Sequence, residues 1–514
     1  MPKIKVLLLG ASGSMGFEAF KNLWQKREVY DIILLQRPSK KNKKLFNKYE
    51  KLCGIKSIPG RGIVEGNGLK IVWGDATNYP DVKEACKYID WCLSPLAFIS
   101  PAADHNPEMA RAVNTIAIEH LVKAIESQPN GAEHIKFVYI GTVAETGDRL
   151  QTIHKGRVGD PLKPSIFDFY AVTKIRGERV VLESNIKHWV SLRQTFIMTT
   201  DNMEDPIMFH QPIDSFMENN TKEDAGRGLI NCLEISDDSD FWRRVYNMGG
   251  GPSCQTTYYD LMKRMFAING LRLEKVVERK WFALRNFHMQ FFEDSHLLNK
   301  YIHNWGHSME DFYEMFANRR PFFLKIITDL CKKAPLIKKI VEKATYKQLE
   351  RLATQSKNST VYWYNNRNDK RISAFYKDYK TFESIPDWGV KMPELDPRKM
   401  QFIRLDHGYD ESKEQLELAA LEKAAKFRGG ECLSSKWDGD LYSTLKWKCA
   451  FNHEFNAKPY TIIKAGHWCP ECLAPPWRYD EIAKKNPYFA QVWYPNHDKE
   501  ENNFYDEKCY EDIL

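Results

Sequence analysis

Long apolar runs are missing from this 514-residue chain: no stretch approaches the roughly 18 apolar residues of a transmembrane helix, which argues against a membrane-spanning protein. A disulfide pattern is also missing, since the eleven cysteines are odd in number and scattered. The apolar run from Val6 to Leu9 is too short for a signal peptide, and glycines follow it instead of a cleavage site. We therefore expect a cytoplasmic protein.

The chain lacks a large excess of charge of either sign, except in one segment. The formal net charge is +7, and residues 318–352 alone carry ten Lys/Arg against three Asp/Glu. The rest of the chain is therefore close to neutral. With 43% hydrophobic and 13% aromatic residues, the chain is long enough to bury two or three globular cores.

A glycine-rich turn follows the first apolar run. Three glycines stand in the pattern Gly-x-x-Gly-x-x-Gly between residues 5–9 and a helical stretch at 17–25. Glycine suits such a turn because the backbone must take unusual dihedral angles and approach a pyrophosphate closely, while the helix dipole attracts the anion. An ordinary glycine-rich turn is the alternative. The pattern predicts a dinucleotide-binding βαβ unit whose phosphate cradle contains Gly10, Ser12, Gly13, Ser14, Met15 and Gly16.

A carboxylate is missing at the end of the second predicted strand, residues 31–35, where NAD-binding proteins usually place one for the ribose. Arg37 and Lys40 stand there instead, and three more lysines follow. Because cations suit a 2′-phosphate, we expect NADP(H) and favour NAD less. A solvated basic loop is the alternative interpretation.

Strand-like and helix-like segments alternate over the first 250 residues. This order predicts an α/β fold, a Rossmann-type doubly wound parallel sheet over residues 1–255. Further strands are expected at 69–72, 91–93, 136–140 and 189–192, and helices at 106–125 and 171–183.

A Tyr-x-x-x-Lys pair, Tyr170 and Lys174, begins the helix predicted at 171–183. The spacing occurs seven times in the chain, so by itself it means little. Tyr170 differs from the other copies because its helix comes after a strand that ends in Gly141-Thr142. Residues four apart on a helix share one face, which brings the phenol and the ammonium together.

The glycine turn, the Gly141-Thr142 strand end and the Tyr170/Lys174 pair follow one another in a characteristic order and spacing. In this respect residues 1–255 resemble the extended short-chain dehydrogenase/reductase family, which includes nucleotide-sugar epimerases and dehydratases. Four further segments of the chain match the family pattern: Gly74-Asp75-Ala76, Asn114, Leu192-Arg193-Gln194 and 247–251.

The resemblance implies roles for individual residues. Tyr170 would exchange a proton with the reacting oxygen, and a nearby ammonium and the cationic nicotinamide would stabilise its phenolate. Lys174 would also bind the nicotinamide ribose, and Thr142 would hold the substrate oxygen, with Thr146 as the competing hydroxyl. The resemblance further assigns Asp75, Ala76 and Leu96 to the cofactor site.

Two segments depart from the family pattern. Residues 93–97 read Leu-Ser-Pro-Leu-Ala where many relatives have an Ala-Ala pair, and residues 194–198 lack the Asn-containing, Gly-Pro-terminated form of sugar-nucleotide enzymes. Both departures weaken a sugar-nucleotide interpretation.

The middle of the chain, residues 256–397, is expected to form a helical, aromatic and basic substrate or lid region. Within it, residues 318–352 have the spacing of two amphipathic helices. Such a face would suit an anionic membrane surface, an acidic acyl-carrier protein or a phosphate-bearing thioester, with nucleic acid less favoured. A solvated basic face packed on the reductase core is the plain alternative.

The C-terminal region, residues 398–514, is predicted to hold a helix at 411–427 and a metal module. Cys449-x3-His453 and Cys469-x2-Cys472 supply three thiolates and an imidazole, the donor set of a closed tetrahedral zinc site, which has no open position for catalysis. His467 is a substitute ligand in this pattern, whereas Cys432 stands too far from the pairs. The segment resembles treble-clef or ribbon-like zinc modules, and a structural or protein-contact role is favoured over nucleic-acid binding.

Together these features predict an NADP(H)-dependent oxidoreductase that acts on a carbonyl/alcohol pair of a small-molecule substrate. Two alternatives stay open: an epimerase or dehydratase that keeps its cofactor bound, and an NADPH-sensing regulator whose zinc module binds a partner. Substrate, direction and oligomeric state are not determined, although relatives commonly pair through two helices as homodimers.

Overall fold

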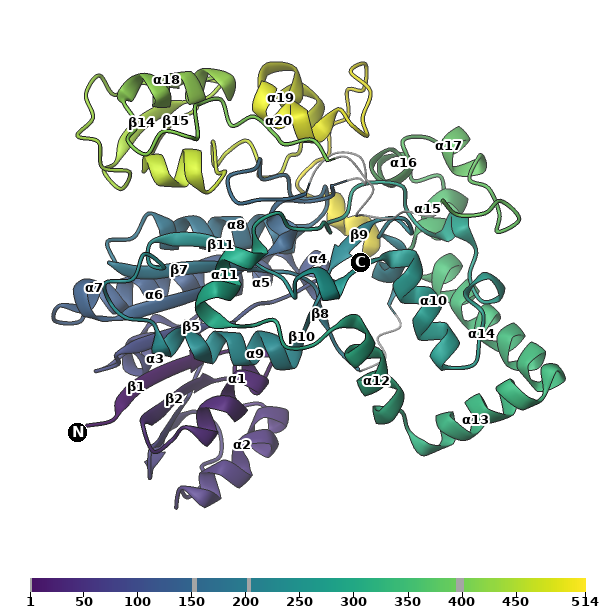
Figure 1. Ribbon diagram of the computed structural model, residues 1–514, viewed down its shortest axis with the longest axis horizontal. Coiled ribbons are helices and arrows are strands. Elements are labelled where there is room, and N and C mark those ends of the chain that lie inside the picture. The colour runs from purple at the N-terminus through teal and green to yellow at the C-terminus, as the bar shows by residue number, and fades with distance from the viewer. Residues whose placement is uncertain (1, 150–154, 201–204, 394–401) are drawn as a thin grey trace.

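The computed structural model describes residues 2–149, 155–200, 205–393 and 402–514 (Figure 1). Its centre is an eight-stranded sheet in the order β11-β7-β6-β5-β1-β2-β4-β3. All neighbours pair in parallel except β3 and β4, which form an antiparallel edge hairpin. The predicted Rossmann-type sheet is therefore confirmed. In sheet order the strands are β11 (Arg244–Met248), β7 (His188–Gln194), β6 (Lys136–Thr142), β5 (Trp91–Ser94), β1 (Ile4–Leu9), β2 (Tyr30–Gln36), β4 (Leu69–Trp73) and β3 (Gly62–Gly66).

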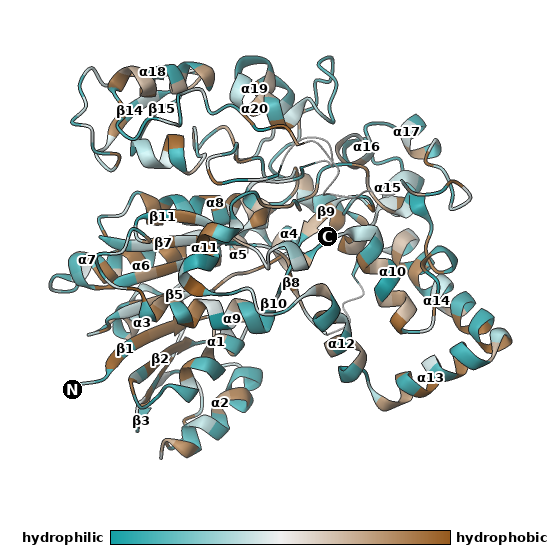
Figure 2. Ribbon diagram, in the orientation of Figure 1, coloured by the Kyte–Doolittle hydropathy of each residue, from teal (hydrophilic) through white to brown (hydrophobic). Residues whose placement is uncertain are grey.

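Helices cover both faces of this sheet. Successive residues of a strand point to opposite faces, so Val6 and Leu8 join the core beneath α1, α2 and α9, whereas Leu7 and Leu9 join the core beneath α3, α6 and α8. Figure 2 shows the apolar strands between their amphipathic helices. The helices of this region are α1 (Ser14–Gln25), α2 (Lys40–Leu52), α3 (Tyr79–Ala85), α4 (Ala102–His105), α5 (Pro107–Arg111), α6 (Ala117–Glu126), α7 (Gly131–His134), α8 (Phe169–Leu182) and α9 (Lys222–Asn231).

Two predicted helices differ from the observed ones. The stretch 106–125 is divided into α5, a π-helical turn at Ala112–Ile116, and α6. The helix predicted at 411–427 is wrong in its first half, because α18 begins only at Leu418. Glu411 instead pairs with the Arg157 guanidinium at 2.9 Å and with His407 at 2.5 Å, and these contacts hold it outside the helix.

The middle region is mostly helical, as predicted, and two small sheets join it to the Rossmann part. The small sheets pair β8 (Ile197–Met198) with β10 (Asn220–Thr221), and β9 (Phe216–Glu218) with β12 (Gln255–Thr257). The helices are α10 (Tyr258–Ile268), α11 (Ser295–Ile302), α12 (Met309–Arg319), α13 (Phe322–Lys333), α14 (Pro335–Gln355), α15 (Thr360–Asn365), α16 (Asp369–Tyr376) and α17 (Tyr379–Glu383).

The C-terminal module packs over α8 and continues the core of the middle region. A single apolar cluster contains Trp281 and Trp363 of the middle region together with Trp447 and Trp493 of the module. The predicted boundary between the two regions, at residue 397, lies outside the described residues. The module consists of α18 (Leu418–Phe427), β13 (Glu431–Cys432), β14 (Leu445–Lys448), β15 (Glu454–Ala457), α19 (Tyr479–Lys485) and α20 (Pro487–Trp493).

Two cationic side chains hold the module to α8. Arg179 donates to the carbonyl oxygen of Trp468 at 2.7 Å, and Lys458 donates to the carbonyl oxygen of Leu182 at 3.1 Å. The segment after the metal ligands also packs on α8, since the Trp477 ring lies 5.3 Å from the Phe169 ring. Throughout the described ranges, every helix is either too short or too polar to cross a bilayer.

A buried charge cluster lies where α8, the sheet and the module meet. Glu178 of α8 accepts from Arg193 of β7 at 2.6 Å and from His467 of the module at 2.8 Å, and Glu145 lies 3.4 Å from the same guanidinium. Arg193 also donates to the carbonyl oxygen of Ala465 at 2.8 Å. Glu145, Glu178 and Arg193 are fully buried, so the charges of Glu178 and Arg193 depend on these partners.

We expect Arg193→Met to destabilise the fold by about 3–5 kcal/mol, because it leaves the buried Glu178 charge without its guanidinium. Equilibrium unfolding in urea, followed by tryptophan fluorescence and circular dichroism, measures the change. Arg244→Met is the matched control, since the exposed Arg244–Asp240 pair is 3.8 Å apart and such pairs contribute at most about 1 kcal/mol. Equal losses in the two variants would contradict the prediction.

Candidate functional site

The glycine turn after β1 forms an open cradle at the carboxyl edge of the sheet. Gly10 has a φ of +66°, and a Cβ there would lie 3.0 Å from the backbone of Leu96. A Cβ on Gly16 would lie 2.1 Å from the Gly10 carbonyl oxygen. Both positions therefore require glycine.

The N-terminus of α1 emerges from this turn without a side-chain cap. Gly13 is the N-cap residue, and both Gly13 and Ser14 are exposed to solvent, whereas Met15 is buried. The first-turn amide groups and the helix dipole form a site of the kind that binds phosphate. The local geometry thus fits the pyrophosphate of a dinucleotide.

The predicted cationic residues lie at the end of β2, beside the cradle. Leu35 pairs in register with Leu9, so Arg37 and Lys40 follow the strand end next to Gly10. Both side chains are exposed, and within the described part of the chain neither forms an ion pair. Lys43 is engaged elsewhere, because it donates to the Ile58 carbonyl at 2.8 Å and lies over the Trp73 ring.

The other predicted cofactor residues follow the ends of β4 and β5. Asp75 accepts from both the backbone amide and the hydroxyl of Thr77, at 2.9 and 2.8 Å, while Ala76 is buried. Leu96 is partly buried in the loop that touches Gly10. Asn114 fixes this loop, since its side chain exchanges two hydrogen bonds with the backbone of Phe98.

Thr142 and Tyr170 lie together at the carboxyl end of β6. Asp168 caps α8 by accepting from the Ala171 amide at 2.8 Å, which sets Tyr170 in the first helical turn. Burial raises the pKa of Tyr170, a hydrogen bond with the Thr142 side chain opposes this rise, and the charges of Glu145 and Asp168 add to it. The protein therefore favours the neutral phenol at Tyr170.

Thr146, the competing hydroxyl, is already committed to other partners. It donates to the Val143 carbonyl at 2.8 Å and accepts from the Gln290 amide at 2.8 Å. Of the two threonines, Thr142 is the one whose side chain meets Tyr170.

Lys174 does not direct its ammonium toward Tyr170, in contrast to the sequence expectation. Its Nζ donates to the Ile140 carbonyl at 2.5 Å and lies 4.1 Å from the Tyr139 ring centroid. Burial lowers the pKa of Lys174 to about 8, although Glu145 and Glu178 favour its charged form. The ammonium therefore faces β6, where the Ile140 carbonyl and the Tyr139 ring receive it.

Sequence reasoning gave no role to the acidic residues of the buried cluster beneath this site. Glu145 accepts from the Thr142 amide at 2.9 Å and completes a capping box with the Thr142 side chain. The Thr-x-x-Glu spacing of such a box was the available signal. Burial and the neighbouring Glu178 raise the pKa of Glu145, whereas Arg193 and His467 lower that of Glu178, so we assign the negative charge to Glu178.

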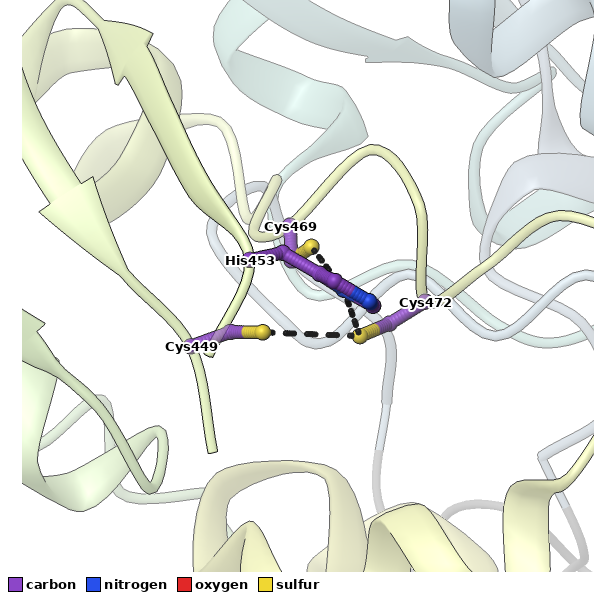
Figure 3. Close-up of side chains that lie close together, drawn as sticks. All are labelled: Cys449, His453, Cys469 and Cys472. Atoms are coloured by element: carbon purple, nitrogen blue, oxygen red, sulfur yellow. Dashed lines mark hydrogen bonds between the residues drawn. The ribbon is translucent and has the colours of Figure 1, made fainter. Parts of the chain in front are cut away.

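A second candidate site lies in the C-terminal module, where the four predicted metal ligands converge (Figure 3). Cys449 and His453 come from the turn between β14 and β15, and Cys469 and Cys472 from the loop before α19. Their ligand atoms all lie within 4.8 Å of one another. Among the described residues, this is the group whose geometry suits a metal ion.

The spacing of the ligand atoms fits tetrahedral zinc. Bonds of about 2.3 Å to sulfur and 2.0–2.1 Å to nitrogen place two sulfurs about 3.8 Å apart, and sulfur and nitrogen about 3.6 Å apart. The Cys449 and Cys472 sulfurs are 3.8 Å apart, and His453 Nδ1 lies 3.4 and 3.6 Å from the sulfurs of Cys469 and Cys472. The amide of Phe451 also donates to the Cys449 sulfur at 3.4 Å.

The two weaker ligand candidates lie outside this cluster. His467 bonds Glu178 in the charge cluster, where burial lowers its pKa to about 4 and keeps the imidazole neutral. Cys432 lies on β13 and is not part of the group.

Comparison with solved structures finds similar folds at low identity. The dTDP-glucose 4,6-dehydratase of Bacillus anthracis, in complex with NAD, is 13% identical over 61% of this chain and 96% of its own, with a TM-score of 0.46. The UDP-glucose 4-epimerase of Thermus thermophilus, in complex with NAD, is 14% identical over 61% and 98%, with a TM-score of 0.44. The UDP-Glc/GlcNAc 4-epimerase of Campylobacter jejuni is 14% identical over 66% and 99%, with a TM-score of 0.43.

No protein-family model and no curated protein matches the chain. Because the TM-scores of these three structures are all below 0.5, their likeness carries no argument about chemistry. The fold assignment therefore stands on the strand order and the parallel pairing of the sheet itself.

Proposed function

We propose that this protein is a nicotinamide-dinucleotide-dependent oxidoreductase that reduces a carbonyl or oxidises an alcohol on a small-molecule substrate. The observation that carries the proposal is the pairing of Thr142 with Tyr170 at the sheet edge that also bears the open glycine cradle. Neither feature alone identifies an enzyme. Together they supply a phosphate site after β1 and a proton donor after β6, both at the carboxyl edge of the parallel sheet, where α/β proteins bind ligands.

The cradle residues would hold the dinucleotide through their backbone. Gly10, Gly13 and Gly16 keep the turn tight, and the uncapped amides of α1 would bind the pyrophosphate. When bound, the cofactor supplies or accepts a hydride at its nicotinamide ring.

Tyr170 would transfer the proton and Thr142 would orient the substrate oxygen. Because the surroundings raise the pKa of Tyr170, the phenol is protonated near neutral pH and suited to donate to the oxygen of a carbonyl. Lys174 remains in the proposal as the cation one helical turn away, with a pKa of about 8. Carbonyl reduction is the direction that this electrostatic setting favours.

NADP(H) is the proposed form of the cofactor. Arg37 and Lys40 leave the end of β2 exposed beside the cradle, and Arg37 stands where NAD-binding proteins usually place a carboxylate. A guanidinium recognises phosphate with paired, charge-assisted hydrogen bonds.

Zinc is the proposed occupant of the Cys3His cluster, in a structural role. Four protein ligands close the coordination sphere, so none remains for water or substrate. The metal would join the β14–β15 turn to the loop before α19, and thereby hold the module in the shape that packs on α8.

Tyr170→Phe should lower turnover by about 100-fold or more, the usual contribution of a positioned acid. The assay follows NADPH absorbance over a panel of ketones, aldehydes and keto-sugar nucleotides. Tyr259→Phe, from another Tyr-x-x-x-Lys copy, is the control and should keep full activity. Full turnover in Tyr170→Phe would refute the acid role. If no panel member oxidises bound NADPH, the oxidoreductase proposal fails and the NADPH-sensing regulator is favoured.

Arg37→Ala should weaken NADPH binding by about tenfold or more, because a charge-assisted hydrogen bond to the 2′-phosphate is lost. Affinity for NADH should change much less. Titration calorimetry with both cofactors measures the difference, and Lys51→Ala, in the exposed last turn of α2, is the charge-matched control. An unchanged preference between the two cofactors in Arg37→Ala would overturn the NADP(H) assignment.

Purified protein should contain about one zinc per chain, and Cys469→Ser should lose it because the site needs all four ligands. Elemental analysis by mass spectrometry measures the ratio, and limited proteolysis should show earlier cleavage within residues 428–514. Cys432→Ser, which removes a thiol outside the cluster, should keep its metal. A metal-free wild type, or full occupancy in Cys469→Ser, would be the contrary result.

A further inference from the structure

Helix α13 exposes its apolar side instead of burying it. Five large apolar side chains recur at positions i, i+1, i+4, i+5 and i+8, so they form a stripe along the helix: Phe322, Phe323, Ile326, Ile327 and Leu330, with exposed fractions of 78, 61, 45, 37 and 44%. Another side of the helix faces the protein, since Thr328 and Cys331 are buried beside Gly270. The stripe is therefore not the surface that packs α13 onto the fold.

Two further exposed apolar side chains follow on α14, after the turn. Leu336 and Ile340, one helical turn apart, are 72 and 61% exposed, whereas their neighbours Ile337 and Val341 pack against the core. We call these seven exposed side chains of α13 and α14 the apolar stripe. Soluble helices normally bury such a surface, and a contiguous exposed patch marks an interaction site.

The segment that carries the apolar stripe is strongly basic. Residues 318–352 carry ten Lys/Arg against three Asp/Glu, and one of those three, Glu342, is bound by Arg272 from outside the segment at 2.7 Å. Across the described ion pairs, Arg319 is the single cation of the ten that meets a carboxylate. Lys332, Lys333 and Lys339 are exposed near the turn between the helices.

The position of α13 in the fold leaves this surface accessible. Figure 1 shows α13 and the start of α14 at the outer edge of the molecule, away from the central sheet and the C-terminal module. Figure 2 shows apolar and polar residues alternating along both helices. A projecting helix of this kind reaches a flat surface before the rest of the protein does.

We propose that the apolar stripe seats this protein on an anionic lipid bilayer, with α13 lying in the plane of the interface. An interfacial helix buries apolar side chains at the boundary between headgroups and acyl chains, while lysines bind anionic headgroups. Lysine stems also extend along the apolar layer and keep their ammonium groups in water. A helix of 12 residues is long enough for this arrangement and too short to span the membrane.

A bilayer fits these observations better than an acidic protein does. A protein partner for a convex helix must offer a matching groove, and the basic residues would need carboxylates in fixed positions. A bilayer has no such requirement, because its headgroups rearrange around the helix. The combination of projecting apolar side chains and unpaired cations is what selects the lipid surface.

Vesicle co-sedimentation of the full chain tests the proposal. We expect binding to vesicles that contain phosphatidylserine, at least tenfold weaker binding to phosphatidylcholine alone, and weakening by salt because the attraction is partly electrostatic. Phe322→Ser/Phe323→Ser should reduce binding at least tenfold, and Lys338→Gln/Lys339→Gln should reduce it on phosphatidylserine only. Leu52→Ser/Lys51→Gln, an exposed apolar and basic pair at the end of α2, is the matched control and should bind like wild type.

Three results would overturn the proposal. The first is wild-type protein that does not sediment with phosphatidylserine vesicles. The second is undiminished sedimentation of Phe322→Ser/Phe323→Ser, since charge alone would then explain binding. The third is a dimer in light scattering that dissociates in this variant, because a second copy of the chain would then cover the apolar stripe. Circular dichroism and NADPH affinity of each variant verify that the fold is retained.

Discussion

The buried charge cluster around Glu178 is the constraint on which the arrangement of this protein depends. It draws one carboxylate from α8, one guanidinium from β7 and one imidazole from the C-terminal module into a space without solvent. Charges so placed lose their hydration, and only close, well-oriented partners compensate for that loss. The relative positions of sheet, helix and module are consequently fixed together: a shift of any one of them would leave a charge unpaired.

The same cluster sets the electrostatics of the candidate active site. Helix α8 carries both Glu178 and the Tyr170/Lys174 pair, so the carboxylates that hold the helix also attract the Lys174 ammonium inward. Tyr170 is left with Thr142 as a hydrogen-bond partner and with acidic neighbours. The structure thereby favours a neutral phenol, and the chemistry that suits it is proton donation to a developing alkoxide.

The C-terminal module and helices α13 and α14 contribute to the protein in opposite ways. The C-terminal module shares its tryptophan core with the middle region and contributes His467 and the Ala465 carbonyl to the charge cluster. It is therefore part of the globular body. Helices α13 and α14 instead turn an apolar stripe outward. One addition stabilises the fold from within, and the other presents a surface to something outside it.

The sequence by itself determined the elements whose signal is local. The apolar runs, the glycine spacing and the paired Cys/His spacings predicted the strands, the cradle and the convergence of Cys449, His453, Cys469 and Cys472, because each depends on residues close together in the chain. Tertiary structure alone decided three features: the exposure of the apolar stripe, the start of α18 at Leu418, and the inward turn of Lys174. Each depends on a partner far away in sequence. A helical pattern does not reveal which face finds a neighbour, and a lysine's spacing does not reveal which carbonyl or ring will receive its ammonium.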